Sequence, residues 1–176
     1  MRFPSRVVFL ALLFTAGLAI GAFAAKKVAV SPSAFSGKEP SAAANELLVA
    51  ARSLAEDGSY ENLAVARVYY LAGRKDEGQV LMERVMAGKA EAGNAMRVAR
   101  IYQEAGEWAK AKPLFDAVLQ LEPGDEDWLA EIGAQYLLAG DRARAEELFA
   151  ASVKRDPSNL YNTLRMAGAY LGVKPE

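Results

Sequence analysis

The chain has 176 residues, of which 52% are apolar and 24% are charged, and its formal net charge is −1. It has neither histidine nor cysteine, which excludes imidazole acid–base chemistry, disulfide bonds, thiolate metal sites and a lipid-modified N-terminal cysteine. Because the net charge is nearly zero and no basic block occurs, the composition argues against nucleic acid as a partner.

The N-terminal segment differs in composition from the rest of the chain. Residues 1–25 begin with two arginines among their first six residues, continue with an uncharged run over 7–25, and hold the small-x-small sequence AFA at 22–24. Two interpretations stay open, a cleaved signal peptide or an uncleaved N-terminal membrane anchor, because a run of this length can just span a bilayer. Both predict export across the inner membrane of a bacterium, so that the body is periplasmic, either soluble or anchored.

Residues 26–40 (KKVAVSPSAFSGKEP) combine proline, serine, glycine and lysine without an apolar period, which predicts a flexible linker. Residues 41–176 then predict one all-α domain. Apolar residues at helical spacing predict helices over 41–57, 60–72, 75–87, 91–105, 107–120, 126–139, 141–154 and 160–171. Their short connections predict that consecutive helices are antiparallel.

Within this domain, residues 92–125 and 126–159 repeat one another at an offset of 34, with nine identical positions. A period of this size is typical of helical solenoids. Small residues in both helices of a unit allow a close approach of their backbones, and large aromatic side chains fill the space that remains. The positions that we expect to carry this packing are Ala99 and Gly133, Tyr102 and Tyr136, Ala111 and Ala145, Phe115 and Phe149, and Pro123 and Pro157.

This layout resembles the tetratricopeptide repeat. The resemblance implies a right-handed α-solenoid of helix–turn–helix units over about 59–91, 92–125 and 126–159, with a C-terminal capping helix at 160–171 and a second cap at 41–57. The first unit is divergent, because Gly78 stands where alanine is expected and Met82 where phenylalanine is expected.

The resemblance also implies that the first helix of each unit lines a concave groove for a peptide segment or a partner helix. Residues assigned to this groove are Arg67, Tyr70, Met96, Arg97, Arg100, Gln103, Ala130, Ala134, Leu137 and Leu164. Arg67 and Arg100 occupy equivalent places and would form a basic ladder that takes a carboxylate at one end of the groove. The alternative is that both arginines pair with neighbouring acidic residues on a solvated surface.

Two tryptophans begin helices, and we expect Trp108 and Trp128 to pack at unit junctions rather than to serve as ligand platforms. The sequence holds no phosphate-binding glycine loop, nucleophile elbow or metal-ligand spacing, so it predicts no enzyme, no cofactor and no metal site. The predicted function is a non-catalytic protein–protein interaction module or adaptor outside the cytoplasm. The alternative is a membrane-tethered assembly factor for an envelope complex, with residues 7–25 retained.

Overall fold

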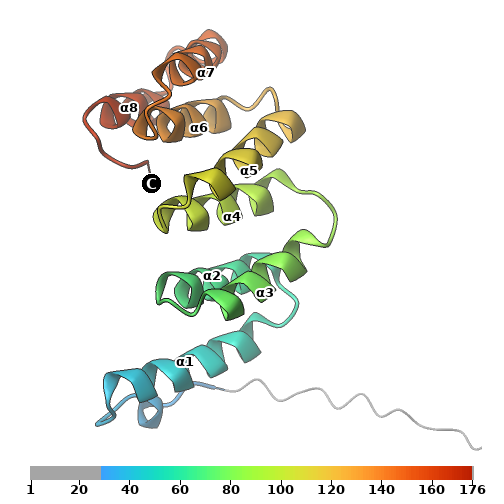
Figure 1. Ribbon diagram of the computed structural model, residues 1–176, viewed down its shortest axis with the longest axis vertical. Helices are drawn as coiled ribbons and strands as arrows, with labels where there is room; N and C mark the ends of the chain where they lie inside the picture. The colour runs from blue at the N-terminus through green and yellow to red at the C-terminus, as the bar shows by residue number, and fades with distance from the viewer. Residues whose placement is uncertain (1–28, 176) are drawn as a thin grey trace, which may run out of the picture.

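The computed structural model describes residues 29–175 and shows a stack of antiparallel helices (Figure 1). The described part contains no strand, so the predicted all-α solenoid of helix–turn–helix units is confirmed. The helices are α1 (Pro40–Ala55), α2 (Ser59–Leu71), α3 (Lys75–Met86), α4 (Ala92–Glu104), α5 (Trp108–Leu121), α6 (Glu126–Leu138), α7 (Arg142–Arg155) and α8 (Leu160–Tyr170), preceded by a short 3₁₀ helix, η1 (Pro32–Ala34).

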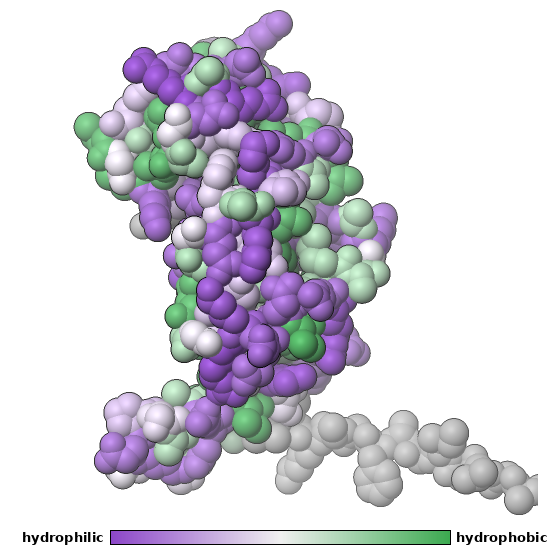
Figure 2. All heavy atoms as spheres, in the orientation of Figure 1, coloured by the Kyte–Doolittle hydropathy of each residue, from purple (hydrophilic) through white to green (hydrophobic). Residues whose placement is uncertain are grey.

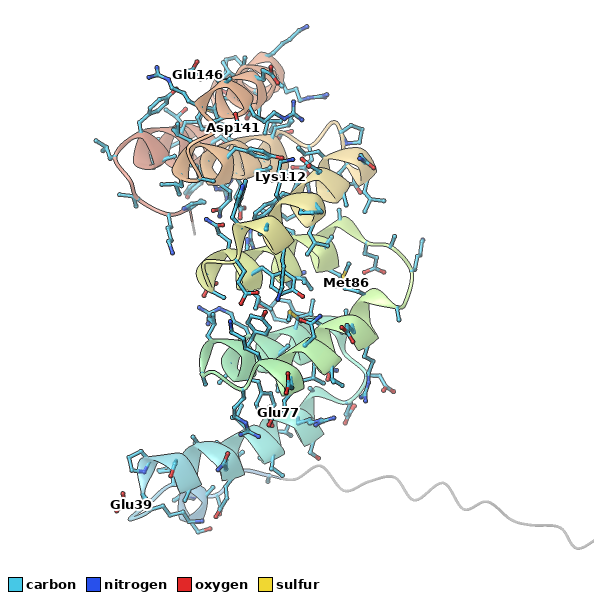
Figure 3. All side chains as sticks on the ribbon, viewed as in Figure 1. Glu39, Glu77, Met86, Lys112, Asp141 and Glu146 are labelled. Atoms are coloured by element: carbon cyan, nitrogen blue, oxygen red, sulfur yellow. The ribbon has the colours of Figure 1, made fainter. Side chains whose placement is uncertain are left out.

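The helices pack as hairpins, α2 with α3, α4 with α5, and α6 with α7. We call α2, α4, α6 and α8 the first helices and α3, α5 and α7 the second helices. First helices of neighbouring units also meet, α2 with α4 and α6 with α8. The polar side chains of one unit reach those of the next across these junctions (Figure 3).

The three hairpins share one turn. Gly73, Gly106 and Gly140 follow their first helices with φ angles of +85°, +76° and +91°. Only glycine adopts this left-handed conformation without steric cost. In the last of these turns the amide of Asp141 donates to the carbonyl of Tyr136 over 3.0 Å, and equivalent bonds close the other two turns. The turn therefore sets the antiparallel return of every second helix.

Glycine is also required where α6 crosses α7. A Cβ atom added at Gly133 would lie 2.7 Å from the ring of Phe149 and 3.2 Å from the carbonyl of Ala145. Gly78 in α3 is equally crowded, because an added Cβ would lie 2.9 Å from the carbonyl oxygen of Ala66. The glycine that marks the first unit as divergent in sequence is thus the residue that allows α2 and α3 to approach closely.

The repeated aromatic residues fill the core as predicted. Phe115, Tyr136 and Phe149 are buried, and so are Ala111 and Ala145. The repeat tyrosines also have a polar role that their size alone does not indicate.

Three repeat tyrosine hydroxyls bond to the second helix of the preceding unit. Tyr136 donates to Asp116 of α5 over 2.5 Å, and Tyr170 donates to Glu146 of α7 over 3.1 Å. Tyr102 makes the same link to Gln79 of α3 over 2.8 Å. A phenylalanine would fill the space but would not make these links between units.

The structure bears differently on the two expectations for the N-terminal part of the chain. The predicted signal peptide or anchor lies outside the described residues. The linker predicted over 26–40 has local structure in its described part, since η1 lies against α1 and Lys38 pairs with Glu46. Within residues 29–175 no helix is long and apolar enough to cross a membrane.

The capping role predicted for 160–171 stays a prediction. Helix α8 lies at the end of the array, but Leu160, Tyr161, Leu164 and Leu171 are exposed. A cap shields the last apolar face with a polar outer surface. In the space-filling view, some hydrophobic residues are visible at the side of the C-terminal end, among hydrophilic ones (Figure 2). Helix α8 therefore carries exposed apolar side chains at the C-terminal end of the described array.

Candidate protein-binding face

The first helices form one face of the array, which we call the first-helix face. The structure places six of the ten predicted groove residues at least partly on the surface, and these are Arg67, Arg97, Arg100, Gln103, Leu137 and Leu164. The other four are buried, so their assignment to the groove was wrong; they are Tyr70, Met96, Ala130 and Ala134. Their positions face neighbouring helices, which cover them when the units stack.

A cleft of about 360 Å³ lies between α2 and α4 on this face. It brings together the three predicted arginines, Arg67, Arg97 and Arg100. The remaining lining residues are Tyr60, Leu63, Ala64, Ile101 and Glu104. The sequence thus predicted the arginines of the cleft, but it did not predict that Tyr60 and Glu104 line it.

Arg67 is not free to bind a partner. Its Nε donates to Oε1 of Glu104 over 3.0 Å, and its terminal nitrogen pairs with the other carboxylate oxygen. This hydrogen bonding raises the pKa of Arg67. The pair joins α2 to α4 on an exposed surface, where such pairs contribute little stability.

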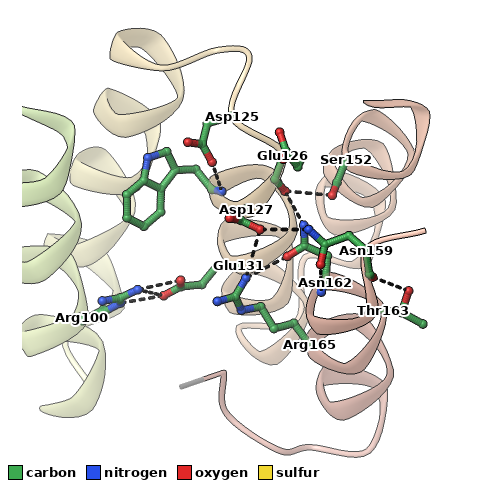
Figure 4. A network of polar contacts seen from close by, with 11 residues as sticks. Arg100, Asp125, Glu126, Asp127, Glu131, Ser152, Asn159, Asn162, Thr163 and Arg165 are labelled. Atoms are coloured by element: carbon green, nitrogen blue, oxygen red, sulfur yellow. Dashed lines mark hydrogen bonds and ion pairs between the residues drawn. The ribbon is translucent and has the colours of Figure 1, made fainter. Parts of the chain in front are cut away.

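Arg100 is held more firmly, by a buried acid of the next unit. Its Nε and a terminal nitrogen each donate to Glu131 of α6 over 2.6 Å (Figure 4). The Glu131 side chain is only 2% exposed. Such two-pronged pairs are strong and directional. The two predicted ladder arginines therefore form ion pairs between units. This agrees with the pairing of the alternative interpretation, although Glu131 is buried and does not lie on a solvated surface.

Polar side-chain contacts also join α6 to α8. Asp127 lies 3.6 Å from Arg165, and the amide of Asn159 donates to Asp127 over 3.4 Å (Figure 4). Beside it, Ser152 and Asn162 both donate to the backbone carbonyl of Glu126. The sequence contains a signal for these links. Asp127 and Glu131 of α6 stand at the repeat positions where α4 has Gly93 and Arg97.

Arg97 is the exception among the arginines that line the cleft. Its guanidinium lies 4.3 Å from the ring centroid of Tyr60, whose side chain is exposed. It donates to the carbonyl of Gly93 over 3.1 Å. Among the described ion pairs none involves Arg97. The cleft therefore holds one cation that rests on an aromatic ring and has no carboxylate partner there.

Tyr70 lies away from the cleft, in a polar cluster between α2 and α5. Its hydroxyl donates to Glu107 over 2.8 Å, and Lys75 and Lys110 reach the same carboxylate over 2.5 and 2.7 Å. Lys110, Lys75 and Tyr70, in that order of effect, lower the pKa of Glu107 to about 2. Burial is the main cause that raises the pKa of Tyr70.

The tryptophans pack at unit junctions, as expected. The Trp108 ring lies edge-on to Tyr136 of the next unit, with 5.2 Å between centroids, and 5.9 Å from Phe115. Trp128 packs against the core and lies 6.0 Å from the guanidinium of Arg100. Both rings therefore help to hold consecutive units together.

Residues 29–175 contain no cluster of acidic side chains that could hold a metal ion. In comparisons with known proteins, the family model described as tetratricopeptide repeat matches residues 102–167. This range begins near the end of α4 and ends within α8. The search of curated proteins finds no match.

Proposed function

The chain belongs to the tetratricopeptide repeat family, and from that premise we propose that it is a non-catalytic adaptor that binds a partner protein along its first-helix face. Tetratricopeptide repeats generally mediate protein–protein interaction. We further propose that the bound element is a peptide segment or a helix that presents an acidic side chain to the cleft between α2 and α4.

The observation that carries this proposal is the state of Arg97. An arginine that already rests on an aromatic ring is partly ordered, so it loses less conformational freedom when it forms a two-pronged bond to a carboxylate. Its neighbours Arg67 and Arg100 are engaged with Glu104 and Glu131. An incoming acid therefore meets Arg97 first, with the ring of Tyr60 and the exposed Ala64 beside it.

Photo-crosslinking in cells that make the full-length chain tests the location of binding. A benzophenone amino acid replaces Ala64 at the cleft or, as a control, the exposed Val80 on α3. We expect a discrete protein adduct from position 64 and none from position 80. Adducts of equal yield from both positions, or from position 80 alone, would contradict the proposal.

A membrane-tethered assembly factor outside the cytoplasm is a second candidate, favoured by the uncharged run at 7–25. The N-terminus of the mature protein separates the two forms. An intact Met1 with alkali-resistant membrane association selects the tethered form, and an N-terminus at Ala25 selects a periplasmic adaptor released from the membrane.

A further inference from the structure

The cleft between α2 and α4 has two unlike ends. Tyr60 meets Arg97 at one end, and Arg67 meets Glu104 at the other. On each helix the two ends are seven residues apart, which is two helical turns, or about 10 Å. A bound segment that follows the cleft therefore meets an arginine without a carboxylate partner at one end and a complete ion pair at the other.

Uncharged side chains lie between the two ends. Leu63 and Ile101 are almost fully buried and form the floor, whereas Ala64 is exposed. Ala64 stands one turn along α2 from Tyr60, whose side chain is 60% exposed. Arg100 also borders the cleft, but its guanidinium is paired with a buried acid of α6. The middle of the cleft therefore offers apolar contact to a partner.

The junction between α6 and α8 shows how an acid pairs with an arginine at the repeat position of Arg97. Arg165 stands at that position on α8, and its guanidinium lies 3.6 Å from the carboxylate of Asp127 (Figure 4). Asp127 in turn stands at the repeat position of Tyr60. The cleft thus has the arginine of this pair, with an aromatic ring in place of the acid. A partner's carboxylate can supply what Asp127 supplies to Arg165.

The opposite end of the cleft disfavours a second acid. Both carboxylate oxygens of Glu104 pair with Arg67, so this arginine is already engaged. The Glu104 side chain is 33% exposed, and an incoming carboxylate would meet its negative charge. Like charges brought together at an interface weaken binding and exclude wrong partners. Glu104 is therefore placed to select against an acid at this end.

We propose that the cleft recognises a segment with one acidic side chain, an apolar side chain beside it and no second acid about 10 Å from the first. The acid pairs with Arg97, and Glu104 repels a second acid. The apolar side chain covers Ala64 beside the ring of Tyr60. The three arginines of the cleft have two glutamates as described ion-pair partners, so a single acid balances their charge. This inference rests on the proposed adaptor function and names the segments that the cleft accepts.

A displayed library of random peptides, selected on the full-length chain in mild detergent, supplies the probes. Peptides that also bind Arg97→Gln are removed. One enriched peptide with a single acid is then synthesised, together with a series in which a second glutamate stands at each other position in turn. A distance of about 10 Å corresponds to about three residues of an extended peptide or about seven of a helix.

Each peptide is titrated into the native chain, into Glu104→Gln and into a control, Glu147→Gln. Glu147 pairs with Arg144 on α7, so its replacement removes an equal charge away from the cleft. Relative to the peptide with one acid, we expect one spacing at which the second glutamate weakens binding to the native chain and to the control. At that spacing Glu104→Gln should bind at least about tenfold more tightly than the native chain, because the freed Arg67 can pair with the second acid.

The outcomes separate this inference from the proposed function. Acidic peptides that share no apolar residue at a constant spacing from the acid would overturn the inference. So would a native chain that tolerates the second glutamate at every spacing, or a loss of affinity that persists in Glu104→Gln. Each of these results leaves the adaptor function standing. A selection that yields no acidic peptide contradicts the adaptor function proposed for the cleft, and this inference with it.

Discussion

Arg67, Arg97 and Arg100 line one cleft, yet the residues that face them give them different roles. Arg67 and Arg100 occupy equivalent positions in consecutive units, but the Glu104 side chain is 33% exposed and that of Glu131 is 2% exposed. The sequence shows the equivalence of the two arginines. It does not show which acids lie opposite them, because that depends on how each unit is rotated against the next.

Removal of Arg100 should destabilise the fold much more than removal of Arg67. Arg100→Ala leaves the carboxylate of Glu131 buried without its partner, and we expect a loss of about 3–5 kcal/mol in the free energy of unfolding. Arg67→Ala breaks an exposed pair and should cost less than about 1 kcal/mol. Urea denaturation of both variants measures the difference, and equal losses would show that Glu131 is not buried.

The cluster around Glu107 predicts a pH dependence of stability. Its pKa is about 2 in the folded chain, against an ordinary value near 4.5. Because the folded value is the lower one, its stabilising effect is present above pH 4.5 and is lost as the pH falls from there towards 2. Thermal melting between pH 6 and pH 2.5 should therefore show a decline that is shallower in Glu107→Gln. Identical profiles for both chains would refute this role.

The helices and their hairpins were predictable because their signals are local. Apolar spacing, a glycine after each first helix and a proline after two of the second helices fixed all eight helices to within two residues of their observed bounds. The burial of Met96, Ala130 and Ala134 was not predictable in this way. Each lies on a first helix, and only the stacking of the units decides which side of that helix stays open.

The α6–α7 hairpin tests the assignment of the repeat positions. Phe149 lies against Gly133 and is almost fully buried. Its replacement by alanine should cost about 3–5 kcal/mol, because the small side chain leaves a cavity between helices that cannot close further. Chemical denaturation gives the value. A loss below about 1 kcal/mol would mean that the repeat positions are assigned wrongly.

At the scale of the described array, the first helices lie along one face of the stack. Ion pairs join consecutive units along the first-helix face. Among the cations of the cleft, Arg97 is the one that no described ion pair engages, so a partner's acid can pair with it there. Exposed apolar side chains also lie on α8, at the C-terminal end of the described array. We therefore assign the proposed adaptor role to the first-helix face.

The most direct test of the adaptor role is a calorimetric titration. The partner segment that crosslinks at position 64 is titrated into the native chain, into Arg97→Gln and into a control, Arg142→Gln, whose side chain on α7 is 71% exposed. Loss of one two-pronged charged contact predicts affinity at least tenfold weaker for Arg97→Gln and unchanged for Arg142→Gln. Equal affinity of Arg97→Gln and the native chain would contradict the proposal that the cleft between α2 and α4 binds the partner's acid.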